Sequence, residues 1–175
     1  ALRDQRGFTL TELLVVTAII GLVMAGIFTL QQQGSQAYLY GSNRVETQQN
    51  ARVALDLMTR EFRSAQSITS IPNGQDITFV DENGTTVRYN LSGTTLNRTD
   101  NAGTLALIGG VQVLTFTYYS AYDGSTNTGT TTTNAALVTS IKAQLETKSE
   151  DTALHNFGDE LTKMESMIRL RNFGL

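Results

Sequence analysis

Residues 7–30 read GFTLTELLVVTAIIGLVMAGIFTL, and this stretch decides the fold. Within it, Glu12 carries the only ionisable side chain. As an α-helix, residues 8–30 would be about 35 Å long, enough to cross the roughly 30 Å hydrocarbon layer of a bilayer. The pattern therefore predicts a membrane-spanning helix. Arginines in the preceding residues 1–7 place positive charge on one side of it, which indicates a cytoplasmic N-terminus.

Glu12 is unusual because it places an ionisable side chain within the apolar span. A carboxylate costs roughly 2.5–3.5 kcal/mol at the centre of a membrane helix and less near its end. One interpretation is a functional residue. The other is a charge at the level of the lipid headgroups, close to the positive N-terminal end of the helix. The anomaly by itself leaves both interpretations open.

Residues 7–16, GFTLTELLVV, resemble the signature of type IV prepilins. The resemblance implies that a prepilin peptidase cleaves between Gly7 and Phe8 and that Phe8 is then N-methylated. It also implies that Glu12 pairs with the N-terminal amine of a neighbouring subunit. Thr29 stands where major pilins commonly carry a helix-kinking proline, which favours a minor component of the filament.

The apolar run has a second interpretation, an ordinary secretory signal peptide. Val23, Met24 and Ala25 would pass as a small-residue cleavage site. The run is longer than a usual signal-peptide core, however, and the charged leader is followed by the prepilin pattern.

We also expect Ala18, Gly21 and Ala25 to form a small-residue face for close helix packing.

Beyond the span, the sequence predicts that the helix continues through residues 31–72. Residues 31–50 are polar and contain Gly34 and Gly41, so we expect any bend or unwinding there. An apolar stripe with spacings of 4, 3, 4 and 3 then predicts an amphipathic helix packed on a sheet. The stripe consists of Ala51, Leu55, Met58, Phe62 and Ala65. We expect Pro72 to close the helical region.

Residues 73–175 are expected to form a β-rich globular head, because the apolar period changes to two. The expected strands are 77–80, 86–91, 95–99, 105–108, 111–119, 138–147 and 164–172, with polar loops at 123–134 and 146–158. The fold class is therefore α+β, with a long N-terminal helix, hydrophobic and then amphipathic, on an antiparallel sheet. Residues 49–63 and the end of the last strand resemble PilW-like minor pilins and J-type pseudopilins of type II secretion.

The sequence contains no recognisable catalytic constellation. Nucleotide-binding and nucleophile motifs are absent, and His155 is the only histidine, which excludes histidine pairs. We therefore expect neither enzyme activity nor a cofactor. Asp123, Ser125 and Asn127 match the start of a calcium loop, but the glycine and glutamate of the EF-hand pattern are missing. A flexible loop is the other interpretation of this segment.

The resemblance predicts a minor pilin or pseudopilin that helps to initiate or cap a type IV pilus or a type II secretion pseudopilus. Its partners would be other minor subunits, the major pilin and the prepilin peptidase. It would cross the inner membrane once and then enter a periplasmic or extracellular filament. The alternative is a tip adhesin or a subunit that binds DNA or another substrate. A net charge of −3 excludes an overall basic surface for binding nucleic acid, but it does not exclude a local basic patch. A third class, an enzyme held by a signal anchor, lacks any supporting motif.

Overall fold

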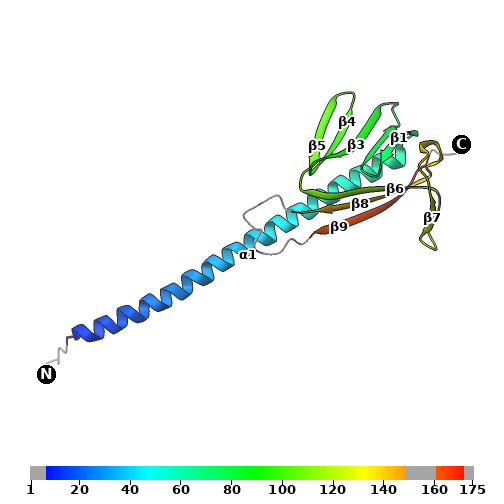
Figure 1. Cartoon of the computed structure of the whole chain (residues 1–175). Coiled ribbons are helices and arrows are strands. Elements are labelled where there is room, and N and C mark those ends of the chain that lie inside the picture. Colours follow the sequence, from blue (N-terminus) through cyan, green and yellow to red (C-terminus); the bar gives the residue numbers. More distant parts are fainter. Residues whose placement is uncertain (1–6, 149–160, 172–175) are drawn as a thin grey trace, which may run out of the picture. The chain divides into compact units, whose positions relative to one another are not determined.

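The structure is a computed structural model and describes residues 7–148 and 161–171. One long helix, α1 (Leu10–Ser64), precedes a series of antiparallel strands, so the protein has the expected α+β arrangement (Figure 1). The chain divides into two compact units, Ala1–Ser42 and Asn43–Leu175. The first contains the N-terminal part of α1, and the second contains the rest of α1 together with the strands.

In the first unit, the described residues from Leu10 onward are helical, and their apolar side chains are exposed. By length and composition, α1 contains a segment apolar enough to cross a membrane. Residues 31–50 remain helical, and neither Gly34 nor Gly41 interrupts α1. An isolated glycine costs only about 1 kcal/mol relative to alanine, which the surrounding glutamines and alanines can offset.

The second unit holds two antiparallel sheets. The first is a five-stranded meander in chain order. Its strands are β1 (Ser67–Asn73), β2 (Asp76–Val80), β3 (Thr86–Ser92), β4 (Thr95–Asp100) and β5 (Gly103–Ile108). Gly84 and Gly93 adopt positive φ angles of 78° and 61° in the turns on either side of β3, a conformation that glycine adopts without steric cost.

The second sheet has four strands in the order β7-β6-β8-β9. Its strands are β6 (Val111–Asp123), β7 (Thr128–Thr131), β8 (Ser140–Thr147) and β9 (Thr162–Arg169), and the short 3-10 helix η1 (Ala135–Leu137) precedes β8. Alternate residues of β8 are buried, namely Ile141, Ala143 and Leu145. Ile141 pairs with Ile168 of β9.

The core lies where α1 meets both sheets. Every residue of the predicted helical stripe is buried. The ring of Phe62 makes edge contacts with Phe79 of β2, Tyr89 of β3 and Phe116 of β6, with centroids 5.2, 5.6 and 5.8 Å away. One helical side chain therefore joins the two sheets.

Three expectations about the elements need correction or lie outside the described residues. Pro72 does not end a helix, because α1 ends at Ser64 and Pro72 belongs to β1. β1 is an edge strand, where a residue without an N–H is tolerated. The expected loop at 123–134 contains β7, which pairs with β6. The loop at 146–158, including His155, falls mostly outside the described residues.

Candidate functional site

The site begins at the first turn of α1, where Thr9 and Glu12 bind each other. The Thr9 N–H donates to Oε2 of Glu12 at 2.9 Å, and the Thr9 hydroxyl donates to the same oxygen at 2.8 Å. In return, the Glu12 N–H donates to Oγ1 of Thr9 at 3.3 Å. This is a capping box, in which a threonine and a glutamate three residues later satisfy each other's otherwise unpaired N–H groups.

The capping box fixes where the anomalous charge lies. It holds the carboxylate at the N-terminal end of the apolar helix, where the helix dipole favours negative charge. Within the described residues, Oε1 of Glu12 accepts no hydrogen bond. A second donor from another molecule could therefore reach this oxygen without displacing Thr9.

Gly7 and Phe8 immediately precede this turn. The Phe8 side chain is 86% exposed, and a Cβ atom built on Gly7 would have no neighbour within 4 Å. Nothing in the described part of the chain therefore requires a glycine at position 7.

Ala18, Gly21 and Ala25 are exposed on the apolar part of α1, and a Cβ atom on Gly21 would meet nothing. Two hydroxyls in this segment bond back to the helix: Thr17 Oγ1 donates to the carbonyl of Leu14 at 3.0 Å, and Thr29 Oγ1 donates to the carbonyl of Ala25 at 2.9 Å. Such back-bonding satisfies polar groups that a lipid environment would leave unpaired. The segment is thus suited to an apolar environment, and its apolar window is exposed in the structure.

The candidate calcium residues lie between β6 and β7. Oδ1 of Asp123 accepts hydrogen bonds from the N–H of Ser125 at 2.8 Å and from its hydroxyl at 2.7 Å. These bonds hold the pKa of Asp123 below its ordinary value. Asn127 has a φ of 54° and accepts a hydrogen bond from the hydroxyl of Tyr122. The three side chains thus contribute to the turn itself. Across residues 7–148 and 161–171, no cluster of three histidine or carboxylate side chains could hold a metal ion.

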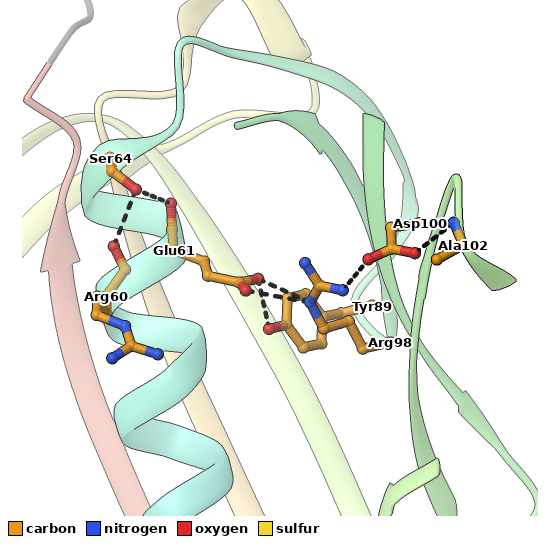
Figure 2. A network of polar contacts seen from close by, with 7 residues as sticks. All are labelled: Arg60, Glu61, Ser64, Tyr89, Arg98, Asp100 and Ala102. Carbon is orange, nitrogen blue, oxygen red and sulfur yellow. Dashed lines mark hydrogen bonds and ion pairs between the residues drawn. The ribbon is translucent and has the colours of Figure 1, made fainter. Parts of the chain in front are cut away.

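Sequence reasoning missed a polar network that joins α1 to the first sheet (Figure 2). Glu61 of α1 accepts hydrogen bonds from the Tyr89 hydroxyl at 2.7 Å and from Nε of Arg98 at 3.1 Å. Arg98 also pairs with Asp100, and that contact lowers the pKa of the Asp100 carboxyl. Burial raises the pKa of Tyr89. No periodicity marks these residues, because they are far apart in the sequence.

Comparison with known proteins supports the interpretation of the N-terminal segment. Residues 2–28 match the family model of the prokaryotic N-terminal methylation motif. No curated protein matches the chain significantly. The matched segment includes Gly7, Phe8, the capping box and the small-residue face. Together with the long N-terminal helix and the antiparallel sheets, this match supports a type IV pilin-like protein.

Proposed function

We propose that the chain is a minor pilin or pseudopilin that helps to initiate or cap a type IV pilus or a type II secretion pseudopilus. A prepilin peptidase would cleave between Gly7 and Phe8, and the new amine at Phe8 would be methylated. Glu12 would then pair with the amine of a neighbouring subunit. The function would be assembly, in keeping with the generally non-enzymatic character of pilin-like subunits.

The observation that carries this proposal is the position of Glu12 within the matched motif. The carboxylate lies at the first turn of the apolar helix and is held there by Thr9. A charge in this position is costly in an apolar environment unless it meets an opposite charge. The N-terminal amine of another subunit would supply that charge and would also fix how the two helices align.

The exposed apolar surface of α1 supports the same role. The segment would first lie in the inner membrane, with the N-terminus on the cytoplasmic side, and would later pack among the helices of a filament. Ala18, Gly21 and Ala25 would allow a neighbouring helix to come close, because none of them carries a side chain larger than a methyl group. Other minor subunits and the major pilin are the proposed neighbours.

The test replaces Glu12 by glutamine in the full chain, in cells that assemble the filament. The side chain keeps its shape and still accepts a hydrogen bond from Thr9, but it loses its charge. We expect normal insertion and cleavage, together with loss of co-purified minor subunits and fewer filaments. Glu46→Gln is the matched control, because Glu46 is an exposed carboxylate of α1 outside the motif.

Thr9→Val separates pairing from helix capping, since it removes the capping hydroxyl but keeps the carboxylate. If Thr9→Val impairs assembly as much as Glu12→Gln, the cap and not the charge is what assembly requires. If complexes and filaments are normal with Glu12→Gln, the charge of Glu12 is not needed for pairing. Glu12 is then a charge at the level of the lipid headgroups.

A further inference from the structure

Two hollows on the second unit share Arg63 and Arg171. One has a volume of about 580 Å³ and is also lined by Arg60, with Asp56 and Glu82 as its acidic residues. The other hollow adds a fourth arginine, Arg169. These four residues, Arg60, Arg63, Arg169 and Arg171, form what we call the arginine cluster.

The second hollow has a volume of about 610 Å³ and is lined by Arg63, Arg169 and Arg171. None of the described residues that line it carries a carboxylate. It is therefore the more positive of the two hollows. Its volume lies within the range of about 300–1,000 Å³ that is typical of small-ligand sites.

Two elements that are distant in sequence supply the arginine cluster. Arg63 lies in the last turn of α1, and Arg60 lies one turn before it, where Figure 2 shows it pointing away from Tyr89 and Arg98. Arg169 is the last residue of β9. Arg171 lies two residues further on, at a bend beyond the strand, and it lines the second hollow together with Arg169.

Packing holds the two elements together at this point. Between the outward arginines, the side chain of Leu170 is buried, and its N–H donates to the carbonyl of Thr139 at 3.0 Å. The hydroxyl of Thr59 on α1 donates to the hydroxyl of Ser166 on β9 at 3.3 Å. Three of the four arginines therefore lie in regular elements, Arg60 and Arg63 in α1 and Arg169 in β9, while Arg171 lies just beyond β9.

Among the described residues, the carboxylates of Asp56 and Glu82 line only the first hollow, and no carboxylate lines the second. No ion pair within the described part of the chain involves any of the four arginines, whereas Arg88 and Arg98 each contact a carboxylate. The helix dipole stabilises Arg63 at the end of α1, but it does not act on Arg169 or Arg171. Four neighbouring guanidinium groups repel one another, and a bound anion would relieve that repulsion.

We propose that the arginine cluster binds phosphate-type oxyanions, with the carboxylate-free hollow as the principal site. A guanidinium group presents a planar pair of donors that matches two phosphate oxygens. The described residues that line both hollows include no aromatic side chain, so bases would not stack there. The phosphate could belong to a free polyphosphate or to the backbone of a phosphodiester polymer. The site is independent of Glu12 and of assembly.

The test uses the full chain in a non-ionic detergent. Sodium tripolyphosphate, followed by calorimetry, represents free phosphate, and a short fluorescent DNA duplex, followed by anisotropy, represents the polymer. The variant Arg169→Ala/Arg171→Ala should weaken binding by about tenfold or more, because each hydrogen bond to a charged group contributes on the order of one tenfold step. Arg52→Ala is the matched control, because Arg52 is exposed on α1 outside both hollows.

The two probes distinguish the sources of the phosphate. Preferential binding of the duplex, with a salt dependence that becomes shallower in the double variant, would assign the site to a polymer. Preferential binding of tripolyphosphate would assign it to a free anion. The proposal is overturned if Arg169→Ala/Arg171→Ala binds the phosphate probes as tightly as the unmodified chain does. It is also overturned if Arg52→Ala weakens that binding as much as the double variant does. Tighter binding of polyglutamate than of either phosphate probe would also overturn it, since the partner would then be an acidic protein surface.

Discussion

The hydroxyl of Tyr89 donates a hydrogen bond to Oε2 of Glu61 over 2.7 Å, and this bond links β3 to the last turns of α1. The ring of Tyr89 is fully buried and packs against Phe62, the residue next to Glu61 in the helix. The same short stretch of α1 therefore makes both the apolar core and the polar network. This arrangement fixes the register of the helix against the first sheet.

The second unit should fold without the apolar segment. We expect a fragment of residues 31–175 to be monomeric and to show a mixed helical and β-sheet circular dichroism spectrum. The reason is that the core of buried side chains lies entirely between Ala51 and Leu170. Analytical ultracentrifugation and circular dichroism check this prediction. An unfolded or aggregated fragment would show that the apolar segment contributes to folding.

Glu61→Leu should destabilise this fragment by about 1–3 kcal/mol, because the substitution leaves the buried hydroxyl of Tyr89 without its acceptor. Arg98 would keep its contact with Asp100, which limits the loss. The measurement is the free energy of unfolding in urea. Glu46→Leu is the control and should change it by less than about 0.5 kcal/mol, because Glu46 is exposed. Equal effects of the two substitutions would mean that the network does not stabilise the fold.

Stability should fall in alkaline solution. Burial raises the pKa values of Tyr89 and Tyr118 in the folded chain above the ordinary value of about 10. The unfolded chain then loses these protons first, so the stabilisation is complete below about pH 10 and is lost as the pH rises further. Urea unfolding between about pH 8 and 11 measures this slope. Tyr89→Phe should make the slope shallower, and an unchanged slope would exclude Tyr89 as its source.

Phe62→Ala should cost roughly 3–5 kcal/mol of unfolding free energy, because it removes the ring that joins both sheets. Urea unfolding of the fragment measures this loss, with Val53→Ala as the control at an exposed position of α1. A loss below about 1 kcal/mol would mean that the core can close around the missing ring.

Co-expression with a prepilin peptidase should remove residues 1–7 and leave a methylated Phe8, as measured by mass spectrometry. Gly7→Val should block cleavage by obstructing the approach to the Gly7–Phe8 bond. It should not disturb the described part of the chain, where no atom lies within 4 Å of a Cβ built on Gly7. Gly26→Val, at another open position, should leave cleavage unchanged. A mature chain that begins at Gly26 would instead establish the signal-peptide interpretation.

The sequence by itself determined the features that depend on neighbouring residues. The apolar span, the prepilin pattern around Glu12 and the buried stripe through Phe62 are all periodic or contiguous in the chain, so composition and spacing reveal them. The apolar period of two likewise predicted strands at 86–91 and 138–147, where the structure has β3 and β8. Each of these features is set by local geometry, with periods of 3.6 residues in a helix and 2 in a strand.

Only the tertiary structure decided which distant segments meet. The strands belong to two separate sheets, and the segment around Pro72 forms an edge strand. Tyr89 donates a hydrogen bond to Glu61, although 28 residues separate the two in sequence. Arg63, in the last turn of α1, and Arg171, just beyond the end of β9, line the same two hollows. Such pairings depend on which faces are buried against each other in three dimensions, and no local period in the sequence encodes that choice.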